Sequence, residues 1–282
     1  MISVFDPRPC SLGEGPLWHP MRHELFWFDI TARQLLSKSR VWQFEEYVSA
    51  AGWISQDQIL IASESQLFKF DLVEEIQTKI CDLESDNSVT RSNDGRADPQ
   101  GGFWIGTMGK NAEVNSGSIY RYYRGELRQL VPNVTIPNAI CFAPDRKTAY
   151  YTDTPTQKIL AVDLDEEGWP ISEARLLIDL TQTGENPDGA VVDATGNIWN
   201  AQWGAARLAC YSPQGLLLKT VDLPAAHATC PAFAGNSNRL FCTSATEGRT
   251  NQELTPADGQ TFETQVSEIG QFEHQVILGE NL

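Results

Sequence analysis

Four polar residues occupy the same place in a repeating sequence pattern, and their side chains carry oxygen atoms that can bind hard cations. They are Glu14, Asn93, Asn138 and Asp188, and each is followed within a few residues by a turn and an aromatic-rich or β-branched segment. Equivalent positions of a closed repeat protein form a ring in space. Carboxylate and amide oxygens are preferred ligands of hard divalent cations. We therefore expect Glu14, Asn138 and Asp188 to converge as a metal site. The alternative is that each residue caps a turn through its own backbone.

The repeat also predicts the fold. Polar turns rich in Gly, Asn and Asp precede short apolar strands in six units: 19–29, 55–63, 98–106, 143–153, 193–201 and 234–242. Their spacing of about 36–50 residues is that of propeller blades. We predict an all-β, six-bladed β-propeller of four-stranded antiparallel blades, with residues 1–282 as a single domain. The strand around 2–5 is expected to complete the last blade beside 275–278. A β-sandwich is the alternative, but it would not predict equivalent units.

Composition narrows the function classes. The 282 residues include 21 basic and 37 acidic side chains, for a formal charge of −16. This sign disfavours binding to nucleic acid or to an anionic membrane surface. The sequence shows no signal-peptide pattern and no window of about 18 apolar residues. Its six cysteines form no C-x-x-C pair. These features favour a cytoplasmic protein with reduced thiols and leave the oligomeric state open.

Residues near the repeated polar positions suggest further roles. Arg91 lies two residues before Asn93, where it could reach the channel mouth and hold a substrate oxygen; a surface salt bridge is the alternative. Asp94 is expected to face away from Asn93 and to brace its loop. Trp203 is interpreted as core packing, and His227 as a residue that could border the channel mouth.

Several motifs, taken together and in order, resemble the senescence-marker/gluconolactonase/regucalcin family. They are Leu12-Gly-Glu-Gly-Pro-Leu-Trp18, Asn93-Asp-Gly-Arg-Ala-Asp-Pro99, Gly106-Thr-Met108, Pro137-Asn138 and Asn186-Pro-Asp-Gly189. The resemblance covers nearly the whole chain. It implies a six-bladed propeller with one divalent cation in its channel.

By this resemblance, Glu14, Asn138 and Asp188 are the metal ligands, and Arg91 and Asn93 contact a sugar lactone. Asp188 matches the residue that also acts as general base. The expected activity is metal-dependent hydrolysis of a sugar-acid lactone, of gluconolactonase or aldonolactonase type, in carbohydrate catabolism. Calcium or zinc is the leading cation, and magnesium, manganese and ferrous iron are compatible.

Two other functions remain open: a calcium-binding propeller without turnover, and an arylesterase or organophosphatase of similar fold. A serine esterase is disfavoured because the chain has no G-x-S-x-G motif. Asn111 stands about where animal members of the family carry an acidic substrate contact. The sequence therefore leaves the particular sugar lactone open.

Overall fold

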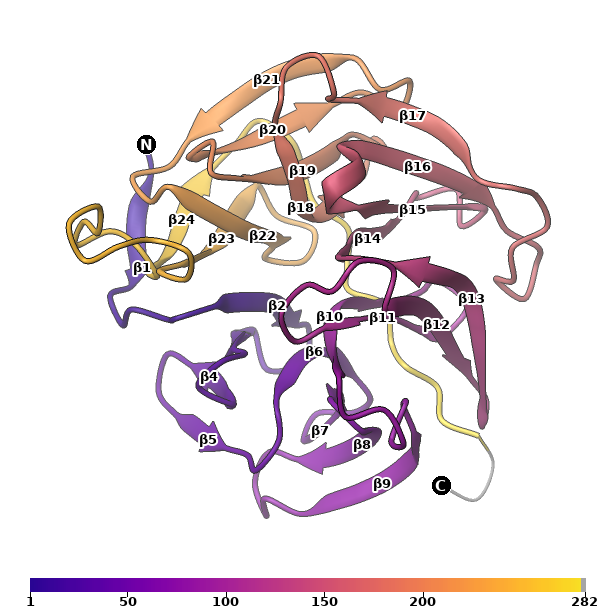
Figure 1. The fold of residues 1–282 in the computed structure, drawn as a ribbon. Coiled ribbons are helices and arrows are strands. Elements are labelled where there is room, and N and C mark those ends of the chain that lie inside the picture. Colours follow the sequence, from indigo (N-terminus) through magenta and orange to yellow (C-terminus); the bar gives the residue numbers. More distant parts are fainter. Residues whose placement is uncertain (280–282) are drawn as a thin grey trace.

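Antiparallel strands are arranged around a common axis in the computed structural model, which describes residues 1–279 (Figure 1). The all-β class is as predicted. The only helical segment in this part of the chain is the short 3-10 helix η1 (Thr154–Thr156). No helix among the described residues is long and apolar enough to span a membrane. The last three residues of the predicted 1–282 domain lie outside the described part.

Four separate antiparallel sheets contain four strands each, in chain order across the sheet. The first contains β2 (Gly13–His19), β3 (Glu24–Asp29), β4 (Gln34–Ser37) and β5 (Val41–Gln43). The second contains β6 (Val48–Trp53), β7 (Gln58–Ser63), β8 (Gln66–Asp71) and β9 (Gln77–Asp82). The third contains β10 (Thr90–Ala97), β11 (Phe103–Gly109), β12 (Gly117–Tyr123) and β13 (Glu126–Val134). The fourth contains β14 (Pro137–Phe142), β15 (Thr148–Asp153), β16 (Lys158–Asp163) and β17 (Arg175–Asp179).

The remaining strands belong to one eight-stranded sheet. It contains β18 (Asn186–Val192), β19 (Ile198–Trp203), β20 (Arg207–Tyr211), β21 (Leu217–Asp222), β22 (His227–Phe233), β23 (Arg239–Ala245), β24 (Thr261–Gln265) and β1 (Ser3–Asp6). The prediction of six four-stranded blades is therefore wrong: within residues 1–279 the propeller has four such blades. The physical reason is one backbone pairing, Trp203 with His227, which joins β19 to β22. The two rings stack with centroids 4.0 Å apart, so the ends of these strands stay together.

The N-terminal strand pairs with a different segment from the one predicted. β1 is antiparallel to β24, with Ser3 opposite Glu263 and Val4 opposite Phe262. The expected partner, residues 275–278, forms no strand. The first strand of the chain, β1, therefore pairs with the last strand, β24, in the same sheet (Figure 1).

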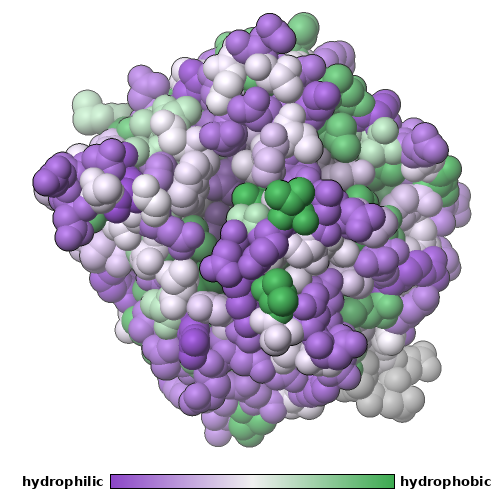
Figure 2. All heavy atoms as spheres, in the orientation of Figure 1, coloured by the Kyte–Doolittle hydropathy of each residue, from purple (hydrophilic) through white to green (hydrophobic). Residues whose placement is uncertain are grey.

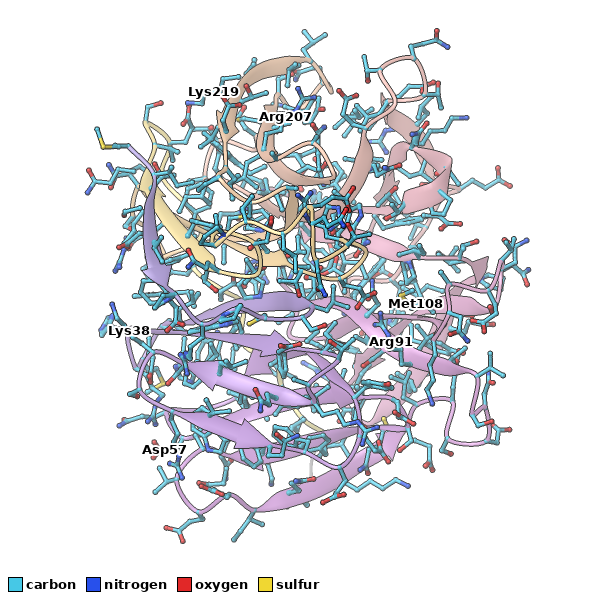
Figure 3. The ribbon with its side chains drawn as sticks, turned by 60° about the vertical axis from the view of Figure 1, so that its left-hand side comes forward. Lys38, Asp57, Arg91, Met108, Arg207 and Lys219 are labelled. Carbon is cyan, nitrogen blue, oxygen red and sulfur yellow. The ribbon has the colours of Figure 1, made fainter. Side chains whose placement is uncertain are left out.

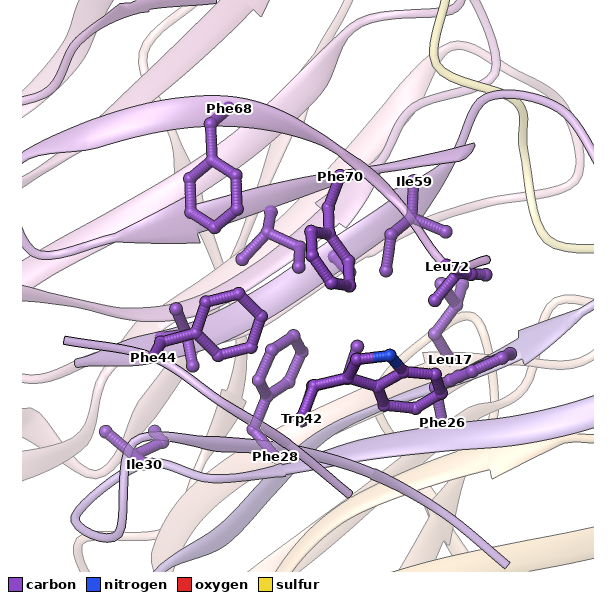
Figure 4. Close-up of a cluster of buried hydrophobic side chains, with 14 of the residues drawn as sticks. Leu17, Phe26, Phe28, Ile30, Trp42, Phe44, Ile59, Phe68, Phe70 and Leu72 are labelled. Atoms are coloured by element: carbon purple, nitrogen blue, oxygen red, sulfur yellow. The ribbon is translucent and has the colours of Figure 1, made fainter. Parts of the chain in front are cut away.

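Large apolar side chains fill the space between neighbouring sheets. Figure 4 shows the cluster in which Phe26 and Phe28 of β3 face Phe68 and Phe70 of β8. Phe44 lies between the two sheets, 5.3 Å from the ring of Phe70 in an edge-to-face arrangement. Because sheets pack on both sides, inner strands are buried on both faces and read as continuous apolar runs. All seven residues of β11 are buried, for example. The packed sheets give the inner strands a rigid frame.

The chain after β24 crosses the end of the axis that lies at the back of Figure 1 (yellow). We call residues 269–277 the C-terminal strap. The Ile269 carbonyl accepts from Ala194 N at 2.8 Å, and Val276 N donates to the Trp53 carbonyl at 2.9 Å. At its centre, Glu273 accepts from Arg96 Nη1 at 2.5 Å. Burial alone would lower the pKa of Arg96, but the charge of Glu273 raises it above its ordinary value. The strap thus closes this end with a buried ion pair.

Replacing Glu273 by Ala should destabilise the fold by about 3–5 kcal/mol, because a buried guanidinium loses its counter-charge. Chemical denaturation followed by tryptophan fluorescence measures this. Asp82→Ala is the matched control, since Lys79 and Asp82 pair at 2.6 Å with side chains 54% and 61% exposed. Loss of that exposed pair should change stability far less, because solvent screens it. Equal effects of the two substitutions would contradict the role of the Arg96–Glu273 pair.

Candidate active site

The five residues singled out by sequence lie in one place. Glu14, Arg91, Asn93, Asn138 and Asp188 line a single cavity of about 380 Å³. Figure 2 shows a hollow near the middle of the face viewed in Figure 1. All five side chains belong to inner strands and are 3–7% exposed. The expected convergence of residues from separate parts of the chain is therefore present, whereas their roles stay predictions.

Apolar residues complete the wall of the cavity. They are Leu12, Met108, Ala112, Ile136, Pro155 and Trp203. Met108 stands directly opposite Arg91 in the β10–β11 pairing, and both are labelled in Figure 3. The cavity therefore combines a few polar groups with an apolar lining, which is the usual character of a small-molecule site.

A β-bulge accompanies each polar residue of the inner strands. The strand pairing shifts between Glu14 and Leu17 in β2 and between Asn138 and Cys141 in β14. Comparable shifts span Asn93 in β10 and Asp188 in β18. A bulge bends the strand and re-aims a side chain. The repeated bulge therefore explains how residues at the same repeat position all turn into the cavity.

Small residues make the bulges sterically feasible. Gly15 has a φ of +53°, and a Cβ there would lie 2.2 Å from the Ser49 carbonyl oxygen. Gly189 follows Asp188, and a Cβ there would lie 2.4 Å from the Cys230 sulfur. Ala139 takes a φ of +56° directly after Asn138. Larger residues at these places would push the inner strands apart.

A chain of hydrogen bonds crosses three inner segments and orients the amides. Arg91 Nη1 donates to Asn93 Oδ1 at 2.9 Å. Asn93 Nδ2 donates to Asn138 Oδ1 at 3.1 Å, and Asn138 Nδ2 donates to Thr154 Oγ1 at 2.9 Å. Thr154 then donates to the Pro187 carbonyl at 2.7 Å, one residue before Asp188. Within the described residues Asn138 Oδ1 accepts one hydrogen bond, from Asn93, so this amide oxygen keeps one free lone pair.

The carboxylates at the axis are buried without enough positive charge. Burial raises the pKa of Glu14 to about 8, and the charge of Asp94 adds to the increase. Burial, followed by the charges of Glu14 and Asp94, raises the pKa of Asp188 well above its ordinary value. Burial also raises the pKa of Asp94 to about 6. These three acids cannot all be ionised unless a cation lies beside them; otherwise at least one of them holds a proton.

The residues fit a hard divalent cation. Glu14 and Asp188 supply buried carboxylates, and Asn138 supplies an amide oxygen held in place by its own donor bond to Thr154. Oxygen donors of this kind suit calcium and related ions, with water completing the shell. No group of three or more His, Cys, Asp or Glu side chains in residues 1–279 is arranged to hold a metal. The predicted set contains two acids, so the Asn138 amide oxygen would be its third ligand.

Asp94 was predicted to brace its loop. Its buried side chain instead connects two inner strands. Its Oδ2 accepts from Ile140 N at 2.8 Å, which ties β10 to β14. The side chain is 5% exposed. Its charge also acts on Glu14 and Asp188, so Asp94 contributes to the electrostatics of the cavity.

Four polar or aromatic residues of the cavity were missed by sequence reasoning or given another role: Thr154, Asn186, Trp203 and Glu247. Asn186 lies inside a quoted motif, and Thr154 follows the strand that pairs with Asn138. Trp203 was interpreted as core packing, and it does pack on the cluster of Figure 4, but it also lines the cavity. Glu247 lies in a loop, where no repeat position marks it.

The fold and the site together define an all-β propeller with an acidic cavity on its axis. The chain belongs to the family described as SMP-30/Gluconolactonase/LRE-like, whose model matches residues 12–246. This confirms the resemblance inferred from the motifs.

Particular relatives extend the comparison. A putative sugar lactone lactonase of Rhizobium meliloti is 39% identical over 93% of this chain and 92% of its own. An L-arabinolactonase of Azospirillum brasilense is 32% identical over 92% of this chain and 90% of its own. Among solved structures, a calcium-binding protein, regucalcin, from Agrobacterium tumefaciens is 39% identical with a TM-score of 0.94. The match covers 98% of this chain and 97% of that protein's chain.

Thr154 connects the amide of Asn138 to the backbone beside Asp188, so its hydroxyl should matter for stability. Thr154→Val leaves one donor and one acceptor without partners and should lower the free energy of unfolding by about 1–2 kcal/mol. Thr156→Val is the matched control in the same helix, because Thr156 is exposed and bonds only to the Asp153 carbonyl. That variant should change stability by less than about 0.5 kcal/mol. If the two variants unfold alike, the hydrogen-bond chain carries little energy.

Proposed function

We propose that this protein is a divalent-metal-dependent lactonase that opens the ester ring of a sugar-acid lactone. The observation that carries the proposal is the meeting of two buried carboxylates, an oriented amide oxygen and an arginine in one cavity. The lactonase names of its relatives support the same reaction class. A role in carbohydrate breakdown follows from such a substrate.

Glu14, Asn138 and Asp188 would hold the cation. When bound, the cation supplies a Lewis acid that polarises a carbonyl oxygen and lowers the pKa of water. The free lone pair of Asn138 and the two carboxylates are the ligands that this chain provides. Asn93 keeps the Asn138 amide in the required orientation.

Arg91 and Asn93 would bind the substrate through their remaining hydrogen-bonding capacity. Arg91 Nη1 is occupied by Ser92 O and Asn93 Oδ1, both at 2.9 Å. Its Nε and Nη2 have no partner within residues 1–279 and can donate to oxygens of the lactone. Both amide hydrogens of Asn93 are used, by the Pro137 carbonyl and Asn138. Asn93 therefore has only a lone pair on Oδ1 to offer to a sugar hydroxyl.

Asp188 would act as general base. It takes a proton from the water whose oxygen attacks the carbonyl carbon. When the bond between this carbon and the ring oxygen breaks, Asp188 returns the proton to the leaving oxygen. The product is the open-chain hydroxy acid, which releases a proton to solution at neutral pH. The apolar wall of the cavity excludes other water and strengthens these electrostatic interactions.

A calcium-binding protein without turnover is the second candidate. The same donor set would bind calcium whether or not chemistry follows, and regucalcin from Agrobacterium tumefaciens is described as calcium-binding. The two candidates differ in whether acid is released from a lactone. The experiments below separate them.

Asp188→Asn should lower kcat for lactone hydrolysis by at least about 10²–10⁴, because a general base is lost. Glu14→Gln removes one ligand only, so excess metal should restore part of its activity. Excess metal should not restore Asp188→Asn. Proton release from several aldonolactones, followed by pH-stat, measures each rate, and circular dichroism checks the fold.

Asp86→Asn is the control for the loss of a carboxylate, since Asp86 is exposed and does not line the cavity. It should keep the parent rate. Full turnover in Asp188→Asn would contradict the base role. Calcium binding without proton release from any lactone in the parent protein would favour the second candidate.

Removal of divalent metal should abolish turnover and lower the melting temperature together. A ligand that binds only the folded state stabilises it by about 2.7 kcal/mol at a concentration 100 times its Kd. Dialysis against EDTA, elemental analysis and readdition of Ca²⁺, Zn²⁺, Mg²⁺ or Mn²⁺ test this by calorimetry and pH-stat. Undiminished turnover in protein shown to be metal-free would reject the metal-dependent mechanism.

A further inference from the structure

Glu247 is an acid of the cavity that the reaction above leaves without a role. It lies in the loop after β23, and its backbone is fixed on two sides. Glu247 N donates to the Ser11 carbonyl at 2.9 Å, and the Glu247 carbonyl lies 2.8 Å from His227 Nδ1. The loop therefore presents this side chain from a defined position.

The Glu247 carboxylate has unused hydrogen-bonding capacity. It has neither a hydrogen-bond donor nor a salt-bridge partner within the described residues. The residue is exposed to solvent, yet it also lines the cavity. The protein around it still raises the pKa of Glu247 by burial, with Arg91 acting in the opposite direction. A carboxylate in this situation can accept hydrogen bonds from a molecule that enters the cavity.

Arg91 provides the complementary group. Among the charged residues near the Arg91 guanidinium, Glu247 affects its pKa most, ahead of Glu14. The cavity thus offers a cationic donor and an anionic acceptor to the same ligand. Hydroxyl groups both donate and accept, so a polyhydroxylated molecule can satisfy both.

Trp203 supplies an apolar surface beside Glu247. Its ring stacks on His227 with an interplanar angle of 22°. A Cβ at Gly248 would lie 3.5 Å from the His227 ring and 3.6 Å from the Trp203 ring. This packing fixes the indole, which also lines the cavity. The C–H face of a sugar ring can pack on such a surface while its hydroxyls point to polar groups.

We propose that Glu247 is a specificity-determining residue that accepts a hydrogen bond from a substrate hydroxyl remote from the ester, while Trp203 packs on the sugar ring. This inference rests on the proposed lactonase function and narrows its substrate class. The favoured substrates are neutral polyhydroxylated lactones. Lactones that carry a sulfonate or phosphate at the Glu247 end are disfavoured, because like charges repel in a partly desolvated site.

Replacing the Glu247 carboxylate by a neutral amide of the same shape tests the inference. Glu247→Gln should lower kcat/KM for gluconolactone and xylonolactone by about tenfold, because the amide oxygen still accepts a hydrogen bond but is no longer a charged acceptor. Hydrolysis of δ-valerolactone, which has no hydroxyl substituent, should stay within about twofold of the parent rate. The ratio of kcat/KM for 6-phosphogluconolactone to kcat/KM for gluconolactone should be higher in the variant than in the parent protein.

Glu173→Gln is the matched control, because Glu173 is exposed and outside the cavity. It should leave all four rates unchanged. Equal losses of Glu247→Gln on hydroxylated and unsubstituted lactones, or no loss on either, would overturn the inference.

A binding measurement separates this inference from the proposed function. Gluconolactam, a lactam that resists hydrolysis, is titrated into parent and variants by calorimetry. We expect its affinity to fall about tenfold in Glu247→Gln and to stay constant in Glu173→Gln. If no lactone is hydrolysed but this difference is found, the lactonase function fails while the hydroxyl recognition stands. Equal affinities of parent and Glu247→Gln would reject the recognition by itself.

Discussion

The burial of like charges on the propeller axis is the constraint on which the site depends. Glu14, Asp94 and Asp188 are each 5–6% exposed. In addition to burial, the charge of Asp94 raises the pKa of Glu14, and the charges of Glu14 and Asp94 raise the pKa of Asp188. Such an arrangement is unfavourable unless a positive group joins it. Near the cavity, Arg91 provides one, and its Nη1 is already committed to Ser92 and Asn93. The remaining negative charge is therefore balanced by a proton or, under the proposed function, by a bound cation.

The fold can hold this arrangement because each acid comes from a different inner strand. Neighbouring sheets pack through large aromatic side chains, so the inner strands cannot easily separate to relieve the repulsion. The bulges turn the side chains inward, and the bonds from Arg91 through Asn93 and Asn138 to Thr154 set the orientation of the amides. Stability of the sheets thus sustains an electrostatically strained centre, as is common where function requires it.

Sequence reasoning located the centre because repeat position translates directly into position around the axis. Glu14, Asn93, Asn138 and Asp188 share one place in the repeat, and a single cavity contains them all. The number of blades was mispredicted because repeat counting does not detect pairing between units, such as that of Trp203 with His227. The partner of the N-terminal strand was also wrong, since both 261–265 and 275–278 are short and neither carries a distinguishing pattern. Thr154 and Glu247 lie outside the inner strands, so the repeat could not identify them.

The two ends of the axis differ in how their buried charges are balanced, and only the cavity end is open to solution. At the strap, Arg96 is paired with Glu273, a residue of the same chain, so the neutralising group cannot leave without local unfolding. At the cavity, the acids outnumber the arginine, and the neutralising group must come from solution. Under the proposed function, a cation and a substrate would exchange only where the chain has not supplied its own counter-charge. Because the C-terminal strap closes the opposite end, this exchange would take place at the cavity that Glu247 and Trp203 line.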